Sequence, residues 1–271
     1  MLLKRTLTAL VLAPLAILLI LLSPTAVLAL VSAAVFVAAL WEWLQLSGLK
    51  QASWHHPWLL VAALAFALLW WLHGTALTPL LLLVGVAWWL LACLWLRHFA
   101  FAAAPTRENR RIKLAAGAAV VFPAWIALLA IHARPHGHWW TLLALVIVWV
   151  ADIGAYFSGR AFGRRKLAPQ ISPGKTWAGA YGALVAGVAA TMLGGWLLHV
   201  PAARLPGLAL LAIVTVGASI VGDLFESLMK RHAQVKDSGT MVPGHGGLLD
   251  RLDSVFAALP VFAAGLWLLG L

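Results

Sequence analysis

The chain has 271 residues, of which 63% are hydrophobic and 10% are charged, and its mean hydropathy is +0.96. Soluble globular domains are about 45–50% apolar and about 25% charged, so this composition excludes an ordinary soluble domain and a disordered chain. It predicts a polytopic membrane protein. Nineteen Lys and Arg against eight Asp and Glu give a net charge of +11. Because nucleic-acid binding needs a soluble basic face, we expect membrane lipid and phosphorylated substrates as partners, and no nucleic acid.

Nine apolar runs are long enough to cross a bilayer core of about 30 Å, which needs roughly 20 helical residues. They cover residues 6–22, 25–46, 58–72, 76–96, 115–131, 139–157, 177–198, 205–223 and 254–271. Open sheet edges are excluded from lipid, so the sequence predicts an all-α fold of about nine transmembrane helices. The first run also fits a signal peptide, but the second run follows so closely that a helical hairpin is favoured.

The distribution of Lys and Arg predicts the orientation, because cytoplasmic loops are enriched in these residues. With the N-terminus inside, 17 of the 19 cations fall in inside segments, and only Arg134 and Arg204 fall outside. Adding or removing one span would scramble this division. We therefore expect a cytoplasmic N-terminus and a C-terminus on the outer side.

Six of the eight carboxylates lie within residues 152–253. Asp152, Asp223 and Asp250 fall near the inside ends of three different spans, where acids next to hydrocarbon tend to be functional. Hard carboxylate oxygens bind hard divalent cations, so this convergence predicts a metal site. Glu42 and Glu108 stand apart from the group.

The spacing of the acids also allows simpler roles. Asp223 and Glu226 are separated by three residues, as are Asp250 and Asp253, so each pair shares a helix face. Glu226 with Lys230, four residues on, fits a plain surface ion pair, and the second pair fits a solvated helix start. Together, and beside a basic, glycine-rich loop, the two pairs favour a site.

That loop contains Lys230, Arg231, Lys236, Asp237 and the run Pro243-Gly244-His245-Gly246-Gly247. Lys and Arg neutralise phosphate charge, and glycines let backbone N–H groups approach phosphate oxygens. A metal, cations and such a loop indicate phosphoryl or nucleotidyl transfer. For His245, a structural role and a substrate contact both remain open.

Ser172-Pro173-Gly174-Lys175-Thr176 precedes the seventh span and contains a Gly-Lys-Thr triplet. A P-loop needs a glycine five residues before Gly174, where Pro169 stands, and no strand is expected ahead of it. The sequence therefore predicts a simpler phosphate-binding turn, with Lys175 as a point charge and Thr176 as a hydrogen-bond donor.

The run from Ser227 to Asp253 resembles the signature of the phosphatidate cytidylyltransferase family, the CDP-diacylglycerol synthases. It reads Ser-x-Met-Lys-Arg-x4-Lys-Asp-Ser-Gly-x3-Pro-Gly-His-Gly-Gly-Leu-x-Asp-Arg-Leu-Asp. Asp152 with Gly154-Ala155-Tyr156, and the segment from Ser172 to Trp177, agree with this resemblance, which covers about residues 145–260. Ile153 departs from it, because a small polar residue is expected there.

The resemblance implies a Mg²⁺-dependent reaction of CTP with phosphatidate that gives CDP-diacylglycerol and pyrophosphate for phospholipid biosynthesis. It implies metal ligation by Asp223 and Asp250, supported by Asp253 and Glu226, and so many carboxylates are compatible with a second cation. The catalytic cations would be Lys230, Arg231, Lys236 and Arg251. The substrate-binding residues would be Ser172, Lys175, Thr176, Asp152, Asp237, His245, Gly246 and Gly247.

The resemblance further implies a homodimer in a bacterial inner membrane, with the active site facing the cytoplasm. Residues 1–271 would form one membrane domain, with hydrophobic spans in 1–114 and catalytic helices and cytoplasmic loops in 115–271. A CDP-archaeol synthase or polyprenol kinase would not be expected to carry the full signature. A cation transporter would place its acids near mid-span, and a structural scaffold would leave their clustering unexplained.

Overall fold

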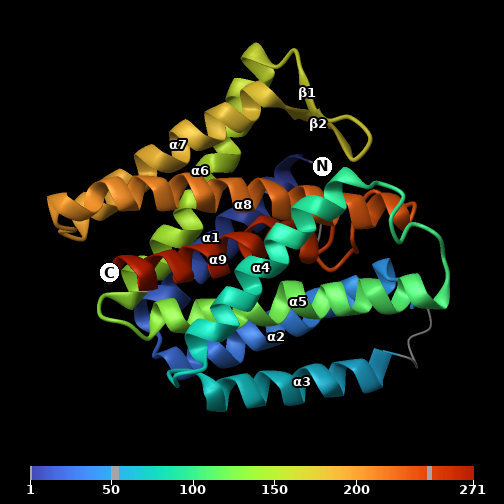
Figure 1. The fold of residues 1–271 in the computed structure, drawn as a ribbon, viewed down its shortest axis with the longest axis horizontal. Helices are drawn as coiled ribbons and strands as arrows, with labels where there is room; N and C mark the ends of the chain where they lie inside the picture. Colours follow the sequence, from blue (N-terminus) through green and yellow to red (C-terminus); the bar gives the residue numbers. More distant parts are fainter. Residues whose placement is uncertain (1, 50–54, 243–245) are drawn as a thin grey trace.

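The computed structural model describes residues 2–49, 55–242 and 246–271, with side chains from Leu10 onward. Its helices are α1 (Leu2–Leu22), α2 (Thr25–Leu46), α3 (His55–Leu72), α4 (Thr78–Arg97), α5 (Arg107–His132), α6 (Gly137–Phe162), α7 (Trp177–Leu197), α8 (Leu205–His232) and α9 (Leu249–Leu269). Strands β1 (Lys166–Ala168) and β2 (Ser172–Thr176) form a hairpin, and Ala202–Arg204 is a 3-10 turn, η2. Figure 1 shows a helical bundle with this hairpin at its edge.

The helices coincide with the nine expected runs. Within the described residues, α2 to α9 are long and apolar enough to cross a membrane, and Leu10–Leu22 of α1 forms a shorter apolar helix. The expected all-α polytopic membrane fold is confirmed. The α8 helix continues to His232, beyond the expected end at residue 223. With 28 residues this helix is about 42 Å long, so it extends beyond a hydrocarbon core of about 30 Å.

The hairpin corrects one expectation, that no strand accompanies the Gly-Lys-Thr triplet. Lys166 pairs with Thr176 and Ala168 with Ser172 in antiparallel register, so the triplet belongs to β2 itself. Between two spans the backbone has to satisfy its own polar groups, and this short pairing does so. The glycine that a P-loop needs is still replaced by Pro169.

Helices α5 and α9 form the centre of the bundle. Each buries more than half of its apolar span, whereas α3 and α7 bury less than a quarter. The α9 helix contacts α2, α4, α5, α6 and α8, and its Phe256 and Phe262 are fully buried. The start of α9 is therefore fixed by neighbours from both halves of the chain.

The loop between α6 and α7 and the loop between α8 and α9, both rich in Lys and Arg, lie at the same end of the bundle. Arg231 Nε, in the last turn of α8, donates a hydrogen bond of 3.0 Å to the Ile171 carbonyl in the hairpin. Arg204, one of the two cations expected outside, donates to the Gly270 carbonyl at the C-terminal end of α9. This arrangement agrees with the expected division of charge. The side that faces the cytoplasm stays a prediction.

Candidate active site

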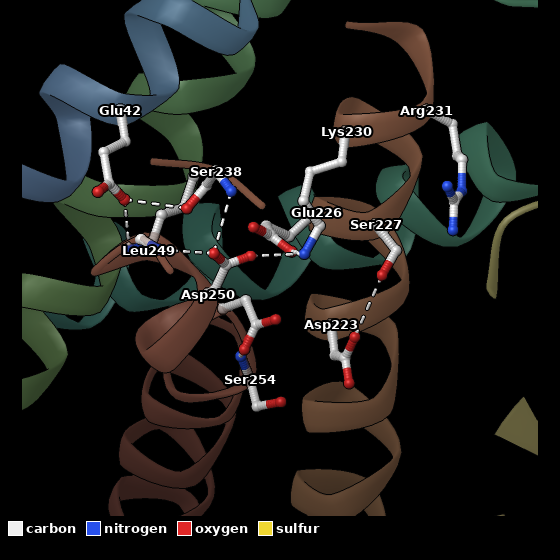
Figure 2. Close-up of polar contacts among 12 residues, drawn as sticks. Glu42, Asp223, Glu226, Ser227, Lys230, Arg231, Ser238, Leu249, Asp250 and Ser254 are labelled. Carbon is white, nitrogen blue, oxygen red and sulfur yellow. Dashed lines mark hydrogen bonds and ion pairs between the residues drawn. The ribbon is translucent and has the colours of Figure 1, made fainter. Parts of the chain in front are cut away.

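Five carboxylates from three helices gather where α8 ends and α9 begins. The negative charge of Asp223 acts on both Asp152 and Asp253, and that of Asp253 acts on Glu226. The fifth member, Asp250, lies in the first turn of α9. The convergence expected from the sequence is therefore present, and Figure 2 shows part of it in close-up.

Lys230 connects the two helices at the centre of this acid cluster. Its Nζ lies 2.5 Å from Glu226 Oε2 and 2.6 Å from Asp250 Oδ1. Because Glu226 is only 2% exposed, the pair that the spacing suggested belongs to the interior and is not a solvated surface pair. The Lys230 ammonium fixes the end of α8 against the start of α9.

Asp250 is also held by the loop that precedes its helix. Its Oδ2 accepts hydrogen bonds from the backbone N–H groups of Ser238 (3.0 Å) and Gly247 (2.9 Å). Asp250 lies in the first turn of α9, as the helix-start alternative required, but its side chain is only 8% exposed and also binds Lys230, so it is not the solvated acid of that alternative. The Asp250 carboxylate thus binds the loop through Oδ2 and Lys230 through Oδ1.

Lys175 brings the hairpin to the cluster. Its Nζ lies 2.5 Å from Asp223 Oδ2, and Ser227 Oγ donates a 3.3 Å hydrogen bond to Asp223 Oδ1. Both partners of this ion pair are partly exposed. The Lys175 ammonium, which we expected to act as a point charge, therefore lies beside the solvent-accessible carboxylate of Asp223.

Sequence reasoning missed Glu42, a residue of α2 that completes the other side of the cluster. This carboxylate is 1% exposed and accepts hydrogen bonds from the backbone N–H groups of Leu248 (3.0 Å) and Leu249 (2.8 Å). Ser238 Oγ donates a third, of 2.9 Å, as Figure 2 shows. The N-cap residue of α9, Leu248, makes no side-chain capping bond. Glu42 therefore caps the N-terminus of α9 from α2. An acid embedded in an otherwise apolar span was the available signal.

A cavity of about 410 Å³ opens beside Asp223 between α6, α7, α8 and the hairpin. Asp152, Lys175, Thr176 and Asp223 give it a polar wall, and the remaining lining is mostly alanine, glycine and other apolar side chains. Gly154 and Gly182 allow the two flanking helices to pack closely here, as small residues do in membrane proteins. The cavity joins a charged rim to an apolar interior.

Lys236 and Asp237, which the sequence placed in the same site, instead line a second cavity of about 940 Å³. It lies between the ends of α2 and α8, the loop before α5, and the first turns of α5. Ser238, at its edge, is the residue that also binds Asp250 and Glu42. The expected substrate-binding residues are therefore divided between two cavities on either side of the acid cluster.

Several expected ligands have structural partners. Thr176 Oγ1 accepts the N–H of Gly179 and caps α7, and Ser172 lies at the start of β2. Arg231 reaches the hairpin carbonyl and points away from the acid cluster (Figure 2). Arg251 has an exposed side chain in the first turn of α9.

The two described glycines of the loop have distinct roles. Gly246 has a φ of +86°, a left-handed conformation that favours glycine. A side chain at Gly247 would collide with Ser238 and Glu42. His245 lies outside the described residues.

The donor chemistry of the cluster suits a hard divalent cation. Within residues 2–49, 55–242 and 246–271, however, no three His, Cys, Asp or Glu side chains are grouped closely enough to hold a metal ion. Two lysine ammoniums lie against the carboxylates. Metal binding is therefore left as a proposal.

Comparisons with known proteins identify the family of the chain. Residues 3–269 match the Cytidylyltransferase family. The chain is 41% identical over 270 residues to a phosphatidate cytidylyltransferase of Pseudomonas aeruginosa, covering 100% of this chain and 98% of that protein. It is 37% identical over 258 residues to the protein of the same name from Haemophilus influenzae, covering 87% and 88% of the two chains. For the Brucella suis protein of that name, identity is 36% over 249 residues, with 89% and 83% covered.

The apolar bundle and the charged cluster at one end of it define a membrane enzyme of the nucleotidyltransferase class. The chain belongs to the cytidylyltransferase family, and the resemblance found in its signature run is confirmed.

Proposed function

We propose that this enzyme transfers the cytidylyl group of CTP to phosphatidate, giving CDP-diacylglycerol and pyrophosphate in a Mg²⁺-dependent reaction. The observation that carries the proposal is a partly apolar cavity lined by two carboxylates of the acid cluster, Asp152 and Asp223, in a chain related over its whole length to phosphatidate cytidylyltransferases. A lipid phosphate at the polar rim leaves its acyl chains beside apolar helix surface. CTP arrives from the water at the same end of the bundle.

Asp223 and Asp250 would hold the Mg²⁺, supported by Asp253 and Glu226. The fit rests on charge: five carboxylates face two ammoniums. When bound, a divalent cation supplies charge neutralisation to phosphate oxygens.

The side chains would act by positioning and neutralisation. A phosphate oxygen of phosphatidate forms a bond to the α-phosphorus of CTP, while the bond from that phosphorus to the bridging oxygen of the β-phosphate breaks and pyrophosphate leaves. Because a phosphomonoester is itself a nucleophile near neutral pH, no Ser or Cys nucleophile is required. Lys175, beside the cavity, would neutralise phosphate charge as a point cation.

The membrane setting follows from the same argument. The relatives are bacterial, and the loops rich in Lys and Arg adjoin the acid cluster. These observations support a bacterial inner membrane with the cluster facing the cytoplasm. Pairing of two copies, implied by the family resemblance, stays a prediction that mass measurement in lipid nanodiscs checks.

The test uses purified full-length protein in lipid with Mg²⁺, phosphatidate and CTP labelled at either the α- or the γ-phosphorus. Cytidylyl transfer carries the α-label into lipid and releases the γ-label as pyrophosphate. A lipid kinase, the rival activity, carries only the γ-label into lipid. Absence of α-labelled lipid from folded protein rejects the proposal.

A further inference from the structure

The second cavity, of about 940 Å³, has the size of a small-molecule site. Three cations line it: Arg110 and Lys113 from α5, and Lys236 from the loop after α8. The one acid in its lining is Asp237, among the described residues. Its wall is therefore net positive.

Lys113 is the unusual member of this lining. It is only 6% exposed, yet its ammonium has no ion pair or hydrogen bond within the described parts of the chain. Its main-chain carbonyl accepts the Trp43 indole N–H at 2.8 Å, which fixes the backbone and leaves the side chain at the cavity. The stem of Lys113 is thus covered while its ammonium remains at the cavity surface with no counter-charge beside it, so an anion that enters the cavity gains a charge-assisted bond.

His232 also lines this cavity. Its Nε2 lies 2.6 Å from the Phe99 carbonyl, while Nδ1 is buried and lacks a partner among the residues described. His232 and Lys113 are close enough to interact electrostatically. The two groups come from different helices and border one cavity.

We propose that this cavity is a binding site for a water-soluble diphosphate-bearing anion, either free pyrophosphate or the terminal phosphates of a nucleoside triphosphate, with Lys113, Arg110 and Lys236 as its cations. Lys and Arg are the residues that neutralise such anions, and charge-assisted bonds to phosphate are the strong ones. The lining comes from helix ends and loops at the end of the bundle where the basic loops gather, which favours an anion from water over a lipid.

The cavity also communicates with the acid cluster. Ser238 lines the cavity, its N–H binds Asp250, and its hydroxyl binds Glu42. Ser238 therefore lies between an anion in the cavity and the Asp250 carboxylate of the acid cluster.

Equilibrium dialysis of the full-length protein in detergent with labelled pyrophosphate tests the inference. The buffer contains EDTA, so that metal-dependent binding at the acid cluster does not contribute. Lys113→Met removes the ammonium at nearly constant side-chain length. Arg111→Met is the matched control, since Arg111 loses the same charge on the same helix but is exposed and outside the cavity.

We expect Lys113→Met to weaken pyrophosphate binding about tenfold or more, and Arg111→Met to leave it near wild type. Without ligand, Lys113→Met should unfold within a few degrees of wild type, because Met fills the same space and the described residues give the ammonium no ion pair or hydrogen bond to lose. Equal binding by both variants overturns the proposal. So does binding that Asp223→Asn abolishes and Lys113→Met preserves, since the anion then sits at the acid cluster.

Competition identifies the source of the anion. Displacement of pyrophosphate by CTP but not by CMP assigns the cavity to the nucleotide tail, and resistance to CTP assigns it to the released product. Displacement by CMP contradicts recognition of a diphosphate. Because no turnover is measured, the result is independent of the label-transfer test of the proposed function.

Discussion

Ser238 Oγ donates a 2.9 Å hydrogen bond to Glu42 Oε2 and joins two segments that are 196 residues apart in the chain. The same carboxylate receives the first N–H groups of α9. A residue of the second helix thereby sets the position of Asp250, in the first turn of the last helix.

Glu42→Ala should destabilise the protein by about 1–3 kcal/mol for each of the three donors that lose their acceptor. Glu108→Ala is the control, because that carboxylate is exposed in the first turn of α5 and contributes about 0.3–1 kcal/mol. Chemical denaturation in detergent measures both. Equal stability of the two variants would show that the Glu42 bonds contribute nothing.

Replacing Lys230 by Met leaves Glu226 and Asp250 buried without their shared cation. Loss of one partner from a buried ion pair is destabilising by about 3–5 kcal/mol, so we expect a loss of that size in the free energy of unfolding. Lys166→Met, in the exposed hairpin, should change it by less than about 1 kcal/mol. A Lys230 variant as stable as the Lys166 variant would contradict the central role of this ammonium.

Substitutions of Thr176 distinguish two possible roles of its hydroxyl, capping of α7 and contact with substrate. Because its oxygen accepts the Gly179 N–H at 3.1 Å, Thr176→Ser keeps the cap of α7 and Thr176→Ala loses about 0.5–2 kcal/mol. Thermal unfolding should follow that order. If the Ala variant unfolds like wild type and only its KM for CTP rises, the hydroxyl acts on substrate and not as a cap.

Cysteine labelling tests the orientation in a Cys93→Ala background. Lys166→Cys and Val235→Cys lie in the two basic loops, and Ala202→Cys lies at the opposite end of the bundle. In intact cells an impermeant maleimide should label only Ala202→Cys, and the other two should label after permeabilisation. The reverse pattern would place the acid cluster on the outer face.

The helices could be predicted from the sequence because lipid permits few alternatives. A long apolar run in a bilayer has to be a helix, and the i,i+4 spacing of Glu226 and Lys230 already implied their contact. The clustering of acids followed from their position at span ends. These features depend on neighbours along the chain.

Contacts between distant segments could not be predicted in the same way. Glu42 appeared isolated because its partners lie some two hundred residues further on. Lys236 and Lys175 both read as phosphate ligands, and only the fold assigns them to different cavities. Lys113 read as one topology marker among many, since burial of its side chain depends on the packing of α2, α5 and α8.

The most direct test of the central claim is the rate of CDP-diacylglycerol formation by Asp223→Asn and Asp250→Asn, compared with Glu108→Gln. The substitutions preserve shape while removing one negative charge, and the control removes the same charge far from the cluster. We predict that both Asp variants lose most of the activity while remaining folded, and that Glu108→Gln keeps it. Near wild-type rates in both Asp variants would contradict the assignment of the reaction to this cluster.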